Sequence, residues 1–127
     1  MTYRELNSYR HLISEIKELE SELAQISYLR VQNYSGMPGK RADVSTVESI
    51  AEKCDKINSR IESRKRMAAE ALDSIDEYIS LIPDSGVRAV FHARFISGLS
   101  YEQIGYKMNM DRRTVSRTIH KYIETNL

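Results

Sequence analysis

Hydrophobic residues in the first quarter of the chain follow a seven-residue repeat. Between residues 4 and 31 they recur at alternating intervals of three and four, without glycine or proline, and most glutamates stay off this line. A helix turns every 3.6 residues, so this spacing gathers the apolar side chains on one stripe and predicts a long amphipathic helix. The stripe consists of Tyr9, Leu12, Ile16, Leu19, Leu23 and Ile26.

Two glycines and a proline then interrupt the pattern between residues 34 and 43. Glycine adopts the positive φ angles that a tight reversal needs, and proline cannot continue a helix. Asp43 or Ser45 is expected to cap the helix that follows, because short polar side chains accept hydrogen bonds from the free N–H groups of a first turn. We therefore predict a turn at residues 34–43.

The seven-residue repeat returns from Val44 to about Ile82, and Pro83 is expected to end it. Together the two helices predict a long antiparallel hairpin over residues 1–83. The second helix is about 1.4 times the length of the first, so the first is expected to cover only its N-terminal part. The stretch around residues 68–75 then needs cover from the C-terminal region or from a second chain. The second seam consists of Val47, Ile50, Cys54, Ile57, Ile61, Ala68, Ala71, Ile75, Tyr78 and Ile82, interrupted by Arg64.

Residues 84–127 show a different organisation, with shorter apolar segments separated by glycine and polar residues. A third helix is predicted at residues 86–97, ended by Gly98. Ser100 with Gln103 forms a capping box for a short helix that contains Gly105. Glycine costs a helix interior about 1 kcal/mol relative to alanine, so Gly105 indicates close approach by another helix. The inward residues of the third helix are Val87, Val90, Phe91 and Phe95.

The short helix and the segment after it match a helix-turn-helix. Asn109 tolerates the left-handed conformation that a tight turn requires, and Asp111 is expected to cap the last helix. That helix presents Val115, Ile119 and either Tyr122 or Ile123 inward. The positions that carry the pattern are Ile104, Gly105, Met108, Asn109, Met110, Val115 and Ile119.

The opposite face of the last helix is basic and predicts contact with DNA. Arginine forms bidentate hydrogen bonds with guanine in the major groove, and the start of a recognition helix reaches base edges. The predicted base-reading residues are Arg112, Arg113, Ser116, Arg117 and His120, and the predicted phosphate contacts are Tyr101, Thr114 and Lys121.

Charge and composition support this division and exclude other classes. The net charge is +1, but residues 1–83 carry twelve Lys/Arg against fourteen Asp/Glu, whereas residues 84–127 carry seven against four. The single cysteine, Cys54, excludes a disulfide within the chain, and no Cys/His cluster has the spacing of a zinc site. We find no apolar segment of membrane-spanning length, no signal peptide, and no phosphate loop or catalytic constellation. We expect no cofactor, metal, small-molecule substrate or enzymatic activity, and a location in the cytoplasm.

The segment VRAVFHARFISGLSYEQIGYKMNMDRRTVSRTIHKYI resembles region four of bacterial sigma factors, and more closely the phage and prophage regulators of the RinA and ArpU type. The segment YSGMPG at residues 34–39 is similar to a loop between two charged helices in a small family of phage proteins. The resemblance covers residues 10–124. It implies a phage- or prophage-encoded regulator of late transcription that acts in a bacterial host.

Three functions follow from these patterns. The first is a sequence-specific transcriptional regulator that binds double-stranded DNA, with a hairpin that dimerises or presents a surface to RNA polymerase. A homo-oligomer, preferably a dimer, is expected because specific affinity is usually built from two half-sites. The second is a phage terminase small subunit, which combines the same elements for DNA packaging. The third is a helical module that binds only protein, such as RNA polymerase or a sigma or anti-sigma partner.

Overall fold

The computed structural model describes residues 1–34 and 44–126, with the side chains of residues 30–34 and 44–46 outside the description. The predicted turn at residues 34–43 and its caps therefore lie outside the described residues. Within the described ranges the regular structure is entirely helical, which confirms the all-α fold class and the pair of long packed helices. The helices are α1 (Tyr3–Tyr34), α2 (Val44–Ser80), α3 (Ser85–Phe91), the π-helical η1 (His92–Ile96), α4 (Tyr101–Met108) and α5 (Arg112–Thr125).

Two compact units divide the chain at a different place from the predicted boundary at residue 83. One unit consists of Ile13–Arg66 and contains most of α1 together with the first part of α2. The other consists of Met1–Leu12 with Met67–Leu127, so it joins the two ends of the hairpin to the four short helices. The start of α1 therefore belongs to the same unit as α4 and α5, the predicted helix-turn-helix.

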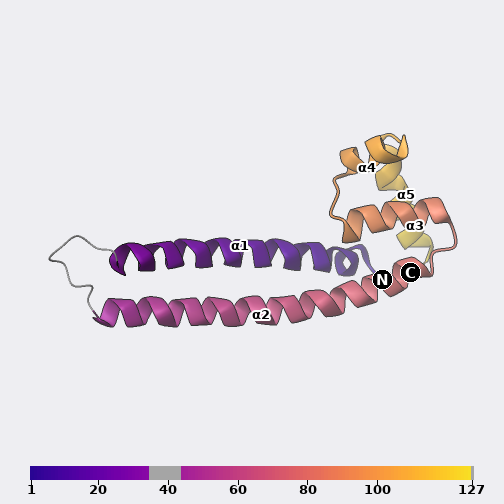
Figure 1. Ribbon diagram of the computed structural model, residues 1–127. Helices are drawn as coiled ribbons and strands as arrows, with labels where there is room; N and C mark the ends of the chain where they lie inside the picture. Colours follow the sequence, from indigo (N-terminus) through magenta and orange to yellow (C-terminus); the bar gives the residue numbers. More distant parts are fainter. Residues whose placement is uncertain (35–43, 127) are drawn as a thin grey trace. The chain divides into compact units, whose positions relative to one another are not determined.

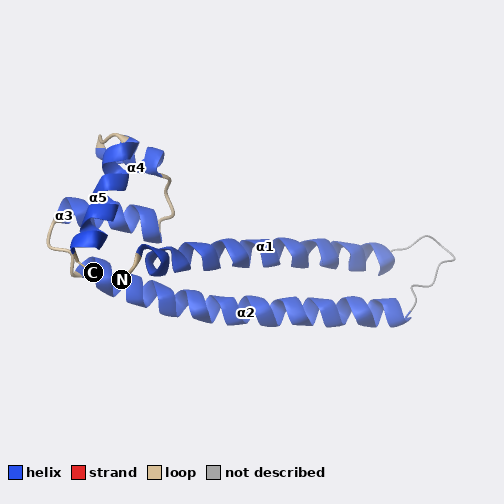
Figure 2. Cartoon of the chain, turned by 180° about the vertical axis from the view of Figure 1, so that it is seen from behind, coloured by secondary structure: helices blue, strands red, loops and turns tan. Residues whose placement is uncertain are grey.

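The unit Ile13–Arg66 is a pair of antiparallel helices that lie side by side (Figures 1 and 2). Four seam residues are buried between them: Ile16, Cys54, Ile57 and Ile61. Arg64, the polar residue in the predicted seam, donates from Nε to Glu15 Oε1 at 2.7 Å. Both side chains stay partly exposed, so this ion pair contributes less than about 1 kcal/mol and mainly makes an arginine tolerable in the seam.

The second unit has a core to which every helix of the unit contributes. This core covers the C-terminal end of α2, because Ile75 packs in one cluster with residues of α3, η1, α4 and α5. The expectation that α1 covers only the N-terminal part of α2 is wrong, since Leu6 of α1 lies in the same cluster. The buried members are Leu6, Ile75, Ile79, Ile82, Val90, Phe91, Ala93, Phe95, Ile104, Val115, Ile119 and Ile123.

The predicted third helix is two segments rather than one. Asp84 begins α3 by accepting hydrogen bonds from the backbone N–H groups of Gly86 and Val87, at 2.8 and 3.1 Å. From His92 the turns widen to π-helical geometry, and Gly98 ends the segment with a φ of 75°. The apolar spacing alone does not distinguish an α-turn from a π-turn, and π-helical turns are frequent at functional sites.

Candidate nucleic-acid interface

The first helix of the predicted helix-turn-helix, α4, begins with the predicted capping box. Ser100 Oγ accepts from the backbone N–H of Gln103 at 3.1 Å, and Gln103 Oε1 accepts from the backbone N–H of Ser100 at 2.9 Å. Two of the N–H groups that a helix start leaves free are thus satisfied by side chains. The start of α4 is fixed by local sequence.

The turn between α4 and α5 has the predicted left-handed residue. Asn109 has φ 57° and ψ 43°, and the backbone N–H of Met110 donates to the Gly105 carbonyl at 2.8 Å. A hydrogen bond that spans five residues in this way closes a helix end whose next residue is left-handed. Met108 and Met110 are half-buried and pack against the core, as predicted for the two sides of the turn.

Gly105 is required by the turn itself. A Cβ at this position would lie 2.5 Å from the Met110 carbonyl oxygen and 3.5 Å from the backbone nitrogen of Arg112. The predicted close approach is present, but its nearest partner is the backbone of the turn and not, as we expected, another helix. The small residue lets the chain fold back across α4 and deliver the start of α5.

The last helix, α5, faces the core as predicted. Asp111 begins it by accepting from the backbone N–H of Arg113 at 3.4 Å. Val115 and Ile119 are fully buried, and Ile123 is buried while Tyr122 stays half-buried against the core. With one face of α5 fixed by these contacts, its N-terminal arginines are left on the opposite, exposed face.

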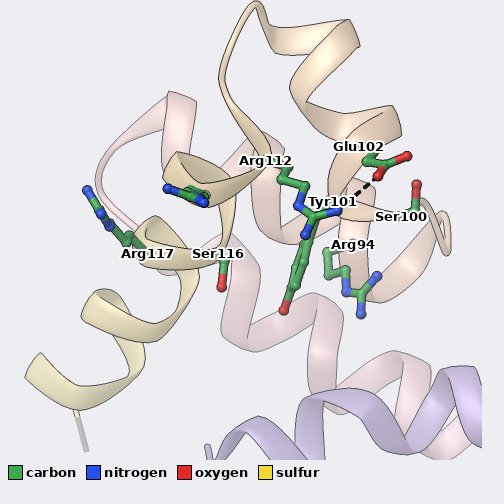
Figure 3. Close-up of a pocket in the computed structure, with 8 residues that line it drawn as sticks. Arg94, Ser100, Tyr101, Glu102, Arg112, Ser116 and Arg117 are labelled. Atoms are coloured by element: carbon green, nitrogen blue, oxygen red, sulfur yellow. Dashed lines mark hydrogen bonds and ion pairs between the residues drawn. The ribbon is translucent and has the colours of Figure 1, made fainter.

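An open groove of about 630 Å³ runs between the start of α4, η1 and the N-terminal half of α5 (Figure 3). It brings together Tyr101 and four of the five predicted base-reading residues. It also includes three residues that the sequence analysis did not assign to the DNA surface. The lining residues are Arg94, Ser100, Tyr101, Glu102, Arg112, Arg113, Ser116 and Arg117.

Three predicted contacts lie elsewhere in the same unit. The ring of His120 lies against the ring of Tyr3, with centroids 4.9 Å apart and planes inclined by 33°. Lys121 lines a separate hollow near the end of α5. Thr114 is exposed, and its backbone carbonyl accepts a hydrogen bond from Thr118 Oγ1 at 2.7 Å. These three residues are therefore not among those that line the groove.

Arg94 is the cation that the sequence analysis missed. Its guanidinium carbon lies 4.2 Å from the centroid of the Tyr101 ring, and Nη1 donates to the Leu99 carbonyl at 3.1 Å. A guanidinium above an aromatic ring is held by attraction to the ring face. Its position next to the buried Phe95 was visible in the sequence, but the direction in which it points depends on the π-helical turn.

Tyr101 joins the groove to the start of α1. Its hydroxyl lies 2.9 Å from the hydroxyl of Tyr3, and Ser116 lies nearby on α5 (Figure 3). Burial raises the pKa of Tyr101, and the hydrogen bond with Tyr3 raises it further. Tyr101 is therefore a neutral phenol at physiological pH. One of the two O–H groups is used in this hydrogen bond, and the other remains as a donor for a second acceptor.

Glu102 is an acid inside a basic groove. Its Oε1 accepts from Arg112 Nη1 at 3.0 Å, and both side chains are mostly exposed (Figure 3). Such a pair contributes little to stability. Its effect on a polyanion is larger, because the carboxylate occupies a donor of Arg112 and repels phosphate.

On the hypothesis that this groove binds DNA, we expect Glu102→Gln to tighten that binding by roughly threefold to tenfold at about 0.1 M salt, because one repulsive charge is removed and Arg112 is released. Titration of a labelled duplex measures this change. Glu124→Gln, which removes an exposed carboxylate from the far end of α5, is the matched control and should change affinity less. Equal effects of the two variants would show that Glu102 acts only through net charge.

The described residues contain no group of three or more His, Cys, Asp or Glu side chains able to hold a metal ion. No helix in residues 1–34 or 44–126 has the length and apolar character needed to cross a membrane. We found no significant match between the chain and any family model, any curated protein or any solved structure.

Proposed function

We propose that the chain is a sequence-specific DNA-binding protein that inserts the N-terminal half of α5 into the major groove of double-stranded DNA. The observation that carries this proposal is the common groove shared by Arg112, Arg113, Ser116 and Arg117. An α-helix fits the major groove, and side chains at the start of a recognition helix are the ones that reach the bases. The caps at both ends of the turn support it, because they fix how α5 is presented.

The residues divide into two roles in this proposal. Arg112 and Arg117 provide guanidinium groups for guanine O6 and N7, and Ser116 provides a short polar contact with either type of base pair. Tyr101, Ser100 and Arg94 stand at the border of the groove and contact the phosphate backbone, which fixes position without reading sequence. Sequence preference is therefore expected to reside in α5, and salt-dependent affinity in both groups.

Transcriptional regulation of phage genes is the biological role we propose, on the resemblance of residues 87–123 to regulators of the RinA and ArpU type. Packaging by a terminase small subunit uses the same DNA-binding elements. The mass of the protein in solution distinguishes the regulator from the terminase small subunit. A dimer supports the regulator, whereas a large ring supports packaging. A dimer would also place two copies of α5 on two half-sites about one helical turn of DNA apart.

Selection of bound duplexes from a random-sequence pool tests the proposal. We expect recovery of one enriched motif, with guanines at positions that the arginines read, and a palindrome if the protein acts as a dimer. A pool that stays random after repeated rounds, in which no duplex outcompetes another, would contradict sequence-specific binding. The third function, binding to protein alone, would then be better supported than a sequence-specific regulator.

A further inference from the structure

One face of α1 carries polar residues at a spacing that places them together beside the groove. Tyr3, Asn7 and Arg10 are separated by four and three residues, so they share one side of the helix. The Tyr3 hydroxyl meets the Tyr101 hydroxyl at 2.9 Å, and Arg10 Nη1 donates to Asn7 Oδ1 at 3.4 Å. All of these residues belong to the compact unit that contains the helix-turn-helix.

Two arginines flank this tyrosine pair: Arg10 lies on the face of α1 that carries Tyr3, and the guanidinium of Arg94 lies over the ring of Tyr101. Burial lowers the pKa of Arg10, and the positive charge of Arg94 lowers it further. Among the described residues neither arginine has a carboxylate within ion-pair distance. Arg94 also holds a buried Nε that has no hydrogen-bond partner in the described structure.

Two guanidinium groups on one border without a carboxylate repel one another, and a bound anion relieves that repulsion. Guanidinium groups bind phosphate through two parallel N–H donors, which suits a phosphodiester more than a spherical ion. The hydroxyl pair of Tyr3 and Tyr101 contributes one further O–H donor. The cluster therefore has the donors and the charge of a phosphate site.

We infer that the face of α1 that carries Tyr3, Asn7 and Arg10 belongs to the DNA surface, and that Arg10 binds a backbone phosphate outside the segment read by α5. This inference rests on the proposed function, because the phosphate belongs to the same duplex. It assigns the N-terminal segment of the chain a role in DNA affinity as well as in the core. Sequence preference is unaffected, since a phosphate contact carries no base information.

Arg10→Gln tests the inference with the full chain and the selected duplex. We expect the slope of log affinity against log salt to become shallower by about 0.9, and affinity to fall roughly fivefold to tenfold at about 0.1 M salt. Arg4→Gln removes the same charge from an exposed position of the same helix and is the matched control, expected to change the slope less. The preferred sequence of both variants should equal that of the wild type.

Folding of each variant is checked by thermal unfolding, because Arg10 contacts the buried Asn7. Arg10→Lys keeps the charge and is expected to retain the wild-type slope, so a folded lysine variant with the shallower slope would overturn the inference. Equal slopes for Arg10→Gln and Arg4→Gln would overturn it too while the proposed function stands. Absence of duplex binding by the wild-type protein would contradict both this inference and the proposed function.

Inorganic phosphate distinguishes DNA from a free anion as the source of the phosphate group. Thermal unfolding at constant ionic strength, with and without inorganic phosphate, measures whether the free anion binds. If phosphate stabilises the wild type and not Arg10→Gln, while the two proteins show the same salt slope on the duplex, the cluster binds a free anion. That result would overturn the assignment to DNA.

Discussion

Gly105→Ala is expected to destabilise the helix-turn-helix by more than about 2 kcal/mol. The new methyl group would lie 2.5 Å from the Met110 carbonyl oxygen, a backbone atom that cannot rotate away as a side chain does. Alanine is the better helix former by about 1 kcal/mol, so the helix propensity works in the opposite direction and the steric effect has to exceed it. This clash is relieved only if the turn opens, and opening the turn also displaces the start of α5.

Chemical denaturation followed by circular dichroism measures this loss. Gly86→Ala is the matched control, because its Cβ would meet only the Asp84 side-chain oxygen, at 3.1 Å, and that carboxylate can adjust. We expect the control to change the free energy of unfolding by less than about 1 kcal/mol. If Gly105→Ala is as stable as Gly86→Ala, the close approach of the turn is not what requires glycine.

Arg112→Ala and Arg117→Ala are each expected to weaken binding to the selected duplex by about 1–3 kcal/mol, which is roughly fivefold to 150-fold. The loss should be concentrated on the base pair that each arginine reads, so that substituted duplexes become nearly equivalent at that position. The cost for Arg112→Ala is expected to be the smaller of the two, since the wild-type side chain must first leave Glu102. Stability should hardly change, because both side chains are exposed.

Competition titrations with single-base variants of the selected duplex give the measurement. Arg4→Ala serves as a control that removes an arginine from outside the groove, and it should lower affinity slightly and equally for all duplexes. Unchanged specificity in both the Arg112→Ala and Arg117→Ala proteins would mean that α5 does not read bases. The groove would then have a role other than recognition of a specific DNA sequence.

Local sequence determines most of the segment formed by α4, the turn and α5, which explains why its parts could be predicted. The capping box at Ser100, the left-handed Asn109 and the cap at Asp111 all depend on residues within a few positions of one another. The inward positions Val115 and Ile119 follow from helical periodicity. None of these features depends on which distant segment packs against them.

Contacts between distant segments account for what could not be predicted. The hydroxyls of Tyr3 and Tyr101 meet across 98 positions of sequence, and the ring of His120 lies against that of Tyr3. The direction of Arg94 depends on a π-helical turn that apolar spacing does not reveal. The sequence left open whether the C-terminal region or a second chain covers the end of α2. The core that Ile75 shares with the C-terminal helices shows that the C-terminal region covers it.

Titration of wild-type protein against the selected duplex and a scrambled duplex, at about 50 and about 200 mM salt, tests the central claim most directly. We predict that the selected duplex binds at least about a hundredfold more tightly. Both affinities should fall by at least about tenfold as the salt rises, since phosphate contacts release counterions. Absent binding, or equal affinity for the two duplexes without dependence on salt, would contradict the assignment of the groove to DNA.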